Sequence, residues 1–289
     1  MDKIAVKALA KINLGLDVLK RREDGYHEVK MVMQTIHLFD QLNIEKCEKG
    51  ISLETNLSFL PTNEGNLAFR AAQMLQEEYH IREGIRIKLN KRIPVAAGMA
   101  GGSTDAAGVL YGVNELFGLG LSRKELMEKG VQLGADVPYC IMRGTALAEG
   151  IGEKLRALPP MVKCPVVIAK PQVSVSTRYV YENLILNEQT KHPDIDRLVQ
   201  DIAKKDLSAI ASDMGNVLET VTIDKYPQIE RIKDSLREHG ALNAMMSGSG
   251  PTVFGLFDNI DDAKTAAAAV RKSGLARQVF VTDVYNNRR

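Results

Sequence analysis

Apolar and polar residues alternate along the beginning of the chain. From Ile4 to Val18 every even position carries an apolar side chain, which is the period of a β-strand with one buried face. The odd positions include Lys11 and Asn13, which therefore project from the same face of this strand. The pattern predicts further strands, namely a returning strand over residues 29–38 after the turn at Asp24-Gly25, and a strand pair over residues 42–44 and 51–53.

Helical periodicity follows in the next part of the chain. The spacing of apolar residues predicts a helix over residues 68–79 and a strand over residues 85–89. A glycine-rich stretch then runs into a helix whose apolar positions lie between residues 106 and 117. Ser122 and Glu125 form a capping-box pattern, which predicts the start of another helix.

A proline-containing stretch at residues 159–165 is the expected boundary between two domains, of residues 1–160 and 161–289. Beyond it the pattern predicts a strand over residues 166–169, a helical block to about residue 239, strands over residues 242–246 and 252–257, a helix over residues 261–272 and a strand over residues 278–284. If the helical block counts as one crossover, the order is βαββαβ, which is the split-βαβ arrangement.

Composition excludes several classes of protein. With 38 Lys and Arg against 36 Asp and Glu the net charge is +2, and no Lys/Arg block exceeds residues 20–22, so nothing favours a dedicated nucleic-acid binder. The 3 cysteines lie far apart without a CxxC pair, which argues against a disulfide framework or a zinc site. No apolar run approaches the roughly 18 residues of a membrane span. We therefore expect a cytosolic protein with no membrane partner.

The clearest candidate for chemistry is the glycine-rich loop GMAGGST at residues 98–104. Its glycines allow the backbone to approach a ligand closely, and the free N–H groups at the start of the following helix attract an anion. Ser103 and Thr104 add hydroxyl groups where phosphate oxygens, or a metal bound to them, would lie. The loop is a candidate phosphate cradle, although a flexible loop with a simple helix cap gives the same pattern. It matches neither a P-loop nor the protein-kinase signatures.

A second glycine-rich motif, MMSGSGPTVFG, occupies residues 245–255 between two predicted strands. An ordinary hairpin turn explains it as well as a binding loop does. Two glycine-rich loops in different halves of the chain suggest, however, a ligand held between domains.

Taken in order, these motifs resemble a known family. PVAAGMAGGSTDAA resembles the phosphate loop of the GHMP family of small-molecule kinases, and SGSGPTVFG resembles its C-terminal glycine motif. The stretches ALAKINLGLDVLKRREDGYHEV and LGADVPYC are similar to one sub-group of that family, and the resemblance spans nearly the full chain. It implies an α+β fold with a first half like ribosomal protein S5 domain 2 and a ferredoxin-like second half. Ala100 stands where the family commonly has glycine, so we expect its φ angle to be negative.

The resemblance also implies roles for individual residues. Lys11 and Asp136 match the family's catalytic pair, in which the carboxylate serves the attacking hydroxyl and the ammonium meets charge on the transferred phosphoryl group. From the residues alone, Lys11 fits a solvated strand position, which is the commoner case for a lysine, and Asp136 fits a turn or helix cap. Asp105 is a rival base, to which we assign a structural role.

ATP is the expected co-substrate, together with Mg²⁺, which Ser103 or Thr104 would reach. Lys91 or Arg92 matches a nucleoside-binding position, but both are equally consistent with ordinary surface charge. The residues that the resemblance assigns to ATP binding are Asn66, Leu67, Lys91, Pro94, Gly98, Ala100, Gly101, Gly102, Ser103 and Thr104.

The sub-group phosphorylates a cytidine diphosphate derivative of a branched tetritol, giving a 2-phosphate, in non-mevalonate isoprenoid synthesis. Tyr26 and Tyr181 are expected to stack on the cytosine and His27 to read its edge, unless the two tyrosines are half-buried packing residues. The residues assigned to the acceptor are Asn13, Tyr26, His27, Asp136, Thr177 and Tyr181.

Two alternative functions stay open at this point. One is a kinase of another small alcohol with the same fold, against which the Asp-Gly-Tyr-His motif at residues 24–27 counts. The other is a non-catalytic regulatory relative, against which the presence of both Lys11 and Asp136 counts. Nothing in the sequence indicates an oligomeric state.

Overall fold

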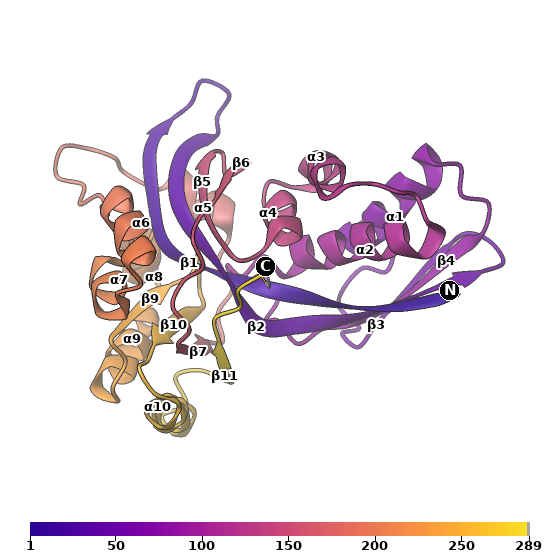
Figure 1. Cartoon of the computed structure of the whole chain (residues 1–289). Coiled ribbons are helices and arrows are strands. Elements are labelled where there is room, and N and C mark those ends of the chain that lie inside the picture. The colour runs from indigo at the N-terminus through magenta and orange to yellow at the C-terminus, as the bar shows by residue number, and fades with distance from the viewer. Residues whose placement is uncertain (288–289) are drawn as a thin grey trace. The chain divides into compact units, whose positions relative to one another are not determined.

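Strands and helices follow one another along the chain of the computed structural model, which describes residues 1–287 (Figure 1). The contacts group the chain into two compact units. Unit 1 consists of Met1–Ala10, Leu38–Val95 and Ala100–Met142, and unit 2 consists of Lys11–His37, Ala96–Met99 and the residues from Arg143 on. Since these units interleave along the chain, they do not test the consecutive division expected near residue 160.

Two long strands, β1 (Lys3–Arg21) and β2 (His27–Cys47), are neighbours in one sheet and contribute residues to both units (Figure 1). β1 confirms the strand that the alternation predicts. β2 continues well past residue 38, so the predicted pairing of residues 42–44 with residues 51–53 is wrong. Residues 42–44 pair instead with β4 (Gly84–Asn90), and β4 separates them from β3 (Ile51–Thr55).

Besides β3, β4 and the end of β2, unit 1 contains four helices. They are α1 (Leu67–Glu78), α2 (Gly101–Phe117), α3 (Arg123–Leu133) and α4 (Val137–Met142). α2 packs closely on β2, because a Cβ atom on Gly108 would lie 2.5 Å from Cδ1 of Leu42, and one on Gly112 would lie 2.5 Å from Cδ1 of Ile44. Glycine therefore permits the approach that sets the height of α2 above the sheet. α3 begins with the predicted capping box.

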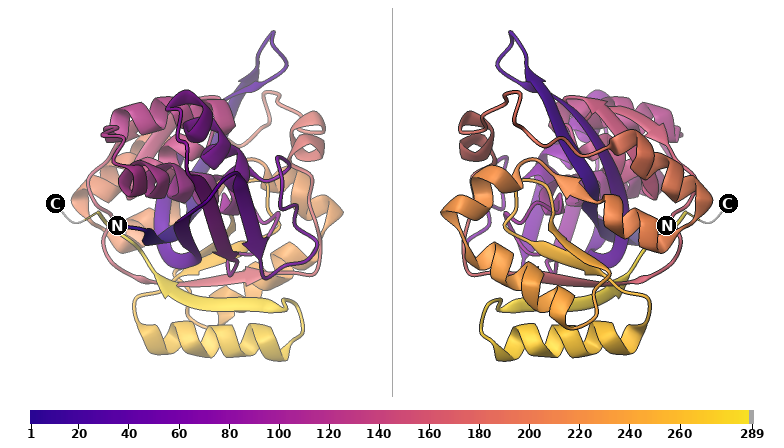
Figure 2. Two further views of the ribbon diagram at one scale, coloured as in Figure 1. Left: turned by 90° about the vertical axis from the view of Figure 1, so that its right-hand side faces the viewer. Right: turned by 90° about the vertical axis from the view of Figure 1, so that its left-hand side faces the viewer.

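Unit 2 contains a four-stranded sheet in the order β11-β7-β10-β9, and all of its neighbouring strands are antiparallel. This order confirms the predicted split-βαβ arrangement. Figure 2 shows the last helix beside the last strand, both in yellow. The bounds are β7 (Pro165–Lys170), α9 (Gln228–Glu238), β9 (Asn243–Met246), β10 (Val253–Leu256), α10 (Ile260–Lys272) and β11 (Gln278–Asp283).

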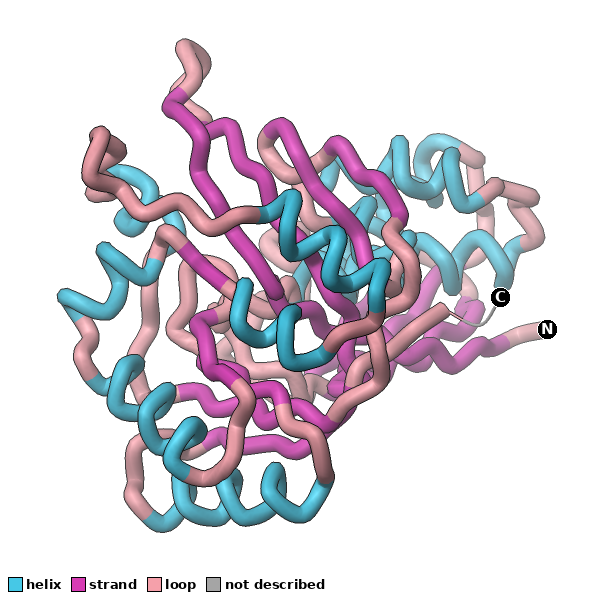
Figure 3. The backbone as a smooth tube through the Cα atoms, turned by 60° about the vertical axis from the view of Figure 1, so that its left-hand side comes forward, coloured by secondary structure: helices cyan, strands magenta, loops and turns pink. Residues whose placement is uncertain are grey.

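The predicted helical block of unit 2 is divided into short helices, and a long loop separates α5 from α6 (Figure 3). Within the block, β8 adds two residues that pair in parallel with Gly15 and Leu16 of β1. Alternation did not predict β8, nor β5 and β6, of which β5 pairs with β2. The bounds are β5 (Thr145–Gly150), β6 (Lys154–Ala157), α5 (Thr177–Glu182), α6 (Ile195–Lys204), α7 (Leu207–Asp213), β8 (Gly215–Asn216) and α8 (Glu219–Lys225).

Within residues 1–287, every helix is too short or too polar to cross a membrane.

Candidate active site

The glycine-rich loop leads directly into α2. Ala100 is the N-cap residue of this helix, with φ 56° and ψ 30°, and no side chain caps the helix start. Our expectation of a negative φ at Ala100 is therefore wrong. A left-handed conformation costs a non-glycine residue about 1–2 kcal/mol, and it persists because neighbouring bonds fix the loop. One of these bonds runs from the backbone N–H of Lys11 to the carbonyl oxygen of Met99, at 3.3 Å.

The first turn of α2 presents backbone N–H groups without a capping side chain. The first helical bond runs from the N–H of Thr104 to the carbonyl of Ala100, at 2.8 Å, so the amides of Gly101, Gly102 and Ser103 precede it. Space above Gly102 is open, since a Cβ atom there would meet only Cδ1 of Leu67, at 3.7 Å. Amides at a helix N-terminus next to open space form a suitable site for an anion.

The two hydroxyl residues of this loop differ in their surroundings. Thr104 is buried, and its hydroxyl donates to the carbonyl oxygen of Leu9 at 2.7 Å. Ser103 is partly exposed. Of the two hydroxyls, that of Ser103 is therefore the one available to a ligand, while that of Thr104 joins α2 to β1.

The second glycine-rich motif is the hairpin turn between β9 and β10, and it contacts the first motif. The hydroxyl of Ser247 donates to the carbonyl oxygen of Gly98 at 2.9 Å. Gly98 has φ 71°, and a Cβ atom on it would lie 2.0 Å from the carbonyl oxygen of Ser247. No residue other than glycine fits at position 98, because the clash is with backbone.

Lys11 is buried although it carries a charge. It is 5% exposed, and its Nζ donates to Oδ1 of Asn13 at 2.7 Å. The amide nitrogen of Asn13 is directed at the sulfur atom of Met31, at 3.3 Å, which fixes the orientation of the amide. Within the part of the chain that the structure describes, no carboxylate pairs with Lys11. The prediction that Lys11 and Asn13 share one face is confirmed, and the solvated alternative for Lys11 is wrong.

Lys91 is also buried, so it is not ordinary surface charge. Its Nζ donates to Oδ2 of Asp40 at 2.5 Å and to Oδ2 of Asp105 at 2.6 Å. Burial raises the pKa of Asp105 to about 8, against the attraction of Lys91. Burial opposes the charge on Lys91, but the neighbouring Asp105 and Asp40 raise its pKa overall. A Cβ atom on Gly101 would lie 3.3 Å from Nζ of Lys91, so this cluster lies directly beside the start of α2.

Asp136 lies between α3 and α4. It is partly exposed, and its carbonyl oxygen accepts from the N–H of Cys140 at 3.1 Å, in the first turn of α4. The carboxylate of Asp136 therefore lies at the N-terminus of the short helix α4. Its partnership with Lys11 stays a prediction.

The other residues assigned to the nucleotide fall around the start of α1 and α2. Asn66 is the N-cap of α1, where its side chain accepts from the N–H of Ala68 at 3.0 Å. The side chain of Leu67 borders the open space above Gly102, and Pro94 is buried. Their contact with adenosine stays a prediction.

The aromatic residues expected at the acceptor do not behave alike. The rings of His27 and Tyr181 contact each other, with centroids 5.1 Å apart and planes inclined by 38°. Tyr26, by contrast, is 59% exposed, so the packing alternative is wrong for this residue. Burial and the nearby charge of Arg21 lower the pKa of His27, which favours a neutral ring. Thr177 begins α5, and its hydroxyl lies 2.8 Å from that of Ser249.

Comparison with protein families agrees with this geometry. The model of the GHMP kinases N terminal domain matches residues 66–144, which contain the phosphate loop, Lys91 and Asp136. The model of the GHMP kinases C terminal matches residues 198–275, which contain the second glycine-rich motif.

Relatives resemble the chain over its full length. A 4-diphosphocytidyl-2-C-methyl-D-erythritol kinase of Lachnospira eligens is 54% identical over 99% of this chain and 99% of its own. One of Lachnoclostridium phytofermentans is 54% identical over 100% and 99%. Among solved structures, a 4-(cytidine 5'-diphospho)-2C-methyl-D-erythritol kinase is 32% identical, with a TM-score of 0.85 over 98% of this chain and 100% of that one. A homoserine kinase from Cytophaga hutchinsonii, 22% identical, shares the fold, with a TM-score of 0.79 over 99% and 96%.

Proposed function

This chain belongs to the GHMP kinases, and we propose that it transfers the γ-phosphoryl group of ATP to a hydroxyl of 4-diphosphocytidyl-2-C-methyl-D-erythritol. The product is the 2-phosphate, an intermediate of non-mevalonate isoprenoid synthesis. A cytosolic location is part of the proposal, because both substrates are charged metabolites.

The observation that carries the proposal is the start of α2. Three consecutive amides, at Gly101, Gly102 and Ser103, precede the first helical hydrogen bond and have no side-chain cap. Their partial positive charge suits the phosphates of ATP, and the open space at Gly102 suits their approach. Asn66, Leu67 and Pro94 are assigned to the nucleoside, and the hydroxyl of Ser103 to a phosphate oxygen. Lys91 belongs to the site because its ammonium lies beside Gly101.

The reaction requires alignment of the hydroxyl and neutralisation of charge. Asp136 orients the acceptor hydroxyl and takes up its proton as the oxygen–phosphorus bond forms and the bond from the γ-phosphorus to the bridging oxygen of ADP breaks. The ammonium of Lys11 stabilises the negative charge that the transferred phosphoryl group carries in the transition state. Among residues 1–287 the buried ammonium of Lys11 has an amide oxygen as its partner and no carboxylate, so an incoming anion would be bound strongly.

Mg²⁺ is part of the proposal as a companion of ATP. Residues 1–287 contain no group of three or more His, Cys, Asp or Glu side chains that could hold a metal ion. The side chains therefore fit a metal that is bound mainly by phosphate oxygens and water, as is usual for Mg²⁺. Bound there, it would neutralise charge on the phosphates.

Recognition of the acceptor is assigned to a small set of aromatic and polar residues. The contact between His27 and Tyr181 supports a role for both at the cytosine. The exposed ring of Tyr26 is available to stack on the base. Asn13 and Thr177 are assigned to the polar part of the acceptor, together with Asp136.

A coupled ADP-release assay with a panel of acceptors tests the function. The panel contains the cytidine compound, its uridine counterpart, 2-C-methyl-D-erythritol 4-phosphate, homoserine and mevalonate. We expect turnover with the cytidine compound and at least tenfold lower kcat/KM with each of the others. Equal turnover with a cytidine-free acceptor would contradict the acceptor assignment, and the absence of turnover with all of them would contradict the function.

Variants test the site in the same assay. Asp136→Asn should lower kcat by about 10²- to 10⁴-fold with little change in the KM for ATP. Tyr181→Ala should raise the acceptor KM by about 5- to 150-fold, the span of base stacking. Tyr179→Ala is the matched control, because Tyr179 lies on the same helix but contacts Lys225. An equal effect of both tyrosine variants would contradict the role of Tyr181.

A further inference from the structure

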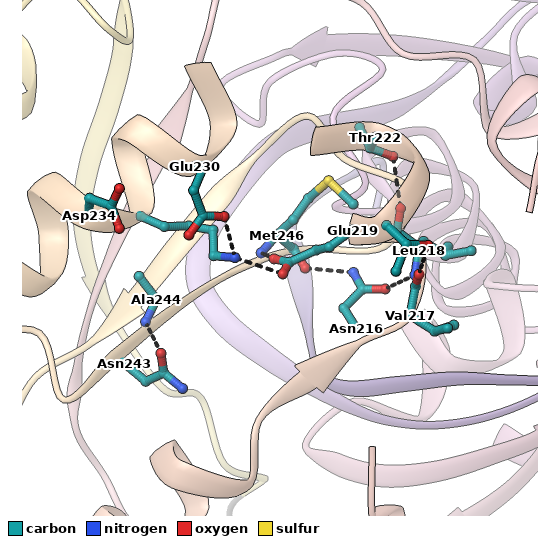
Figure 4. A network of polar contacts seen from close by, with 12 residues as sticks. Asn216, Val217, Leu218, Glu219, Thr222, Glu230, Asp234, Asn243, Ala244 and Met246 are labelled. Atoms are coloured by element: carbon teal, nitrogen blue, oxygen red, sulfur yellow. Dashed lines mark hydrogen bonds and ion pairs between the residues drawn. The ribbon is translucent and has the colours of Figure 1, made fainter. Parts of the chain in front are cut away.

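A buried asparagine holds the turn of the second glycine-rich motif. Asn216, in β8, is 7% exposed, and its amide nitrogen donates to the carbonyl oxygen of Met246 at 2.9 Å (Figure 4). The same nitrogen donates to the carbonyl oxygen of Gly248 at 2.8 Å. Its amide oxygen accepts from the N–H of Leu218 at 3.0 Å. Both donor hydrogens and the acceptor are thus used, so the amide has one orientation only.

The two carbonyls that Asn216 binds flank Ser247. The hydroxyl of Ser247 in turn donates to the carbonyl oxygen of Gly98, and the backbones of Ser247 and Gly98 are too close for any Cβ atom on Gly98. A shift of Ser247 must therefore move Gly98. Two residues after Gly98 comes Ala100, the N-cap of α2, whose left-handed conformation depends on the path of this loop.

A partly buried ion pair holds the backbone N–H of Met246, the residue before Ser247. The N–H of Met246 donates to Oε1 of Glu219 at 2.7 Å, and Oε2 of Glu219 accepts from Nζ of Lys233 at 2.7 Å (Figure 4). Lys233 also binds Glu230, at 2.8 Å. Since Asn216 binds the carbonyl of Met246 and Glu219 its N–H, the residue before Ser247 is fixed at both polar groups. Such fully bonded networks are rigid.

We infer that Asn216 and Glu219 are positioning residues for the phosphates of the nucleotide. They act through Met246, Ser247 and Gly98 and set the geometry of the phosphate loop. The inference rests on the proposed function, because it takes the loop at residues 98–104 as the site of ATP. It gives the short strand β8 and the start of α8 a role in positioning the nucleotide, although both are remote in sequence from the loop.

Asn216→Asp tests the inference, because aspartate has the same shape but cannot donate to the two carbonyls. Calorimetric titration with a non-hydrolysable ATP analogue should show affinity reduced about tenfold or more. The KM for ATP should rise by a similar factor, while the acceptor KM stays within about threefold. Asn243→Asp is the matched control. Its amide donates to the carbonyl oxygen of Ala211 and accepts from the N–H of Ala244 (Figure 4) and from Nε of Arg237, and none of these partners lies in the turn.

Two further variants keep the test decisive if Asn216→Asp does not fold. Ser247→Ala removes only the bond to Gly98 and should reproduce the loss of nucleotide affinity. Glu219→Gln keeps an acceptor for the N–H of Met246 and should retain affinity, whereas Glu219→Ala should not. Nucleotide affinity within twofold of the wild type in folded Asn216→Asp or Ser247→Ala, or an equal loss in Asn243→Asp, would overturn the inference and leave the function intact. A wild type that binds no nucleotide would overturn both.

Discussion

Lys11 and Lys91 are both buried, yet their ammonium groups have different partners. Lys91 donates to two carboxylates, those of Asp40 and Asp105. Asp40 is held in addition by the backbone N–H groups of Arg92 and Ile93. Lys11 donates to one neutral group, the amide oxygen of Asn13, and within residues 1–287 no carboxylate pairs with it.

The difference shows how one residue type serves two purposes at similar burial. The charge of Lys91 is balanced inside the protein, so this lysine joins the end of β4 to β2 and to the start of α2. The charge of Lys11 is not balanced, which is unfavourable in the free protein and becomes favourable when an anion arrives. The uncompensated ammonium is thus the one that gains most from a new anion, whereas the compensated ammonium fixes the residues beside the start of α2.

Removing the charge of Lys11 should have the largest effect on catalysis. We expect Lys11→Met to lower kcat by about 10²- to 10⁴-fold, because the transferred phosphoryl group loses its cation. The free energy of unfolding should stay equal or increase, since no carboxylate is left unpaired. Steady-state kinetics and urea unfolding measure the two quantities. Lys7→Met, on the exposed part of the same strand, is the control and should retain kcat. A destabilised Lys11→Met with normal turnover would reverse the assignment.

Removing the charge of Lys91 should have the opposite signature. Lys91→Met leaves Asp40 and Asp105 together in a buried site, and breaking such a cluster costs about 3–5 kcal/mol of unfolding free energy. The urea midpoint should fall accordingly. A loss below about 1 kcal/mol would mean that water or rearrangement replaces the lysine, and the contrast with Lys11 would disappear.

Much of the fold was predictable because its signals are local. β1, α1, the capping box of α3 and the order of the second half follow from periodicity within short segments. The course of β2 was not, because Asp40 interrupts its apolar alternation. Asp40 occupies a buried strand position because Lys91, 51 residues later, and the backbone N–H groups of the two residues after it supply its partners.

The site was predictable in its residue types but not in its contacts. The motif identified Lys11 and the glycines, and the strand period placed Asn13 on the face of Lys11. Ala100 has a positive φ because the two residues before it are held in place. The carbonyl of Met99 accepts from the N–H of Lys11, and that of Gly98 accepts from the hydroxyl of Ser247. No local pattern in the sequence reveals these bonds. Asn216 and Glu219 were missed for the same reason, since an isolated Asn and Glu carry no signal until the fold brings them to the turn.

If Lys11 is given a carboxylate partner, its charge becomes compensated, as the charge of Lys91 already is. Asn13→Asp keeps the shape of the side chain and should lower kcat by about 10- to 100-fold, because the new charge neutralises the ammonium and repels the phosphoryl group. Kinetics at saturating ATP and acceptor measure the effect. If Asn13 acts through Lys11, Asn13→Ala, which introduces no charge, should slow the Lys11→Met enzyme no further. Additive losses would show that Asn13 acts separately, on the acceptor.

The smallest expected effect, counted per pH unit, concerns the second carboxylate of Lys91. Burial raises the pKa of Asp105 to about 8, whereas in the unfolded chain it lies near the ordinary 3.8. Between these values the unfolded chain ionises first, so the contribution of Asp105 to stability is fully present below about pH 4 and is lost as the pH rises toward 8. The slope is at most about 1.4 kcal/mol per pH unit.

Asp105→Asn tests this pH dependence, because the variant side chain cannot ionise and resembles the protonated acid in shape. The free energies of unfolding of wild type and variant, measured by urea at pH 5, 6, 7 and 8, should therefore diverge in favour of the variant as the pH rises. Other groups titrate alike in both proteins and cancel in the difference. A difference that stays constant with pH would mean that both carboxylates are ionised around Lys91, and the cluster would then carry a net negative charge rather than the balance that distinguishes it from Lys11.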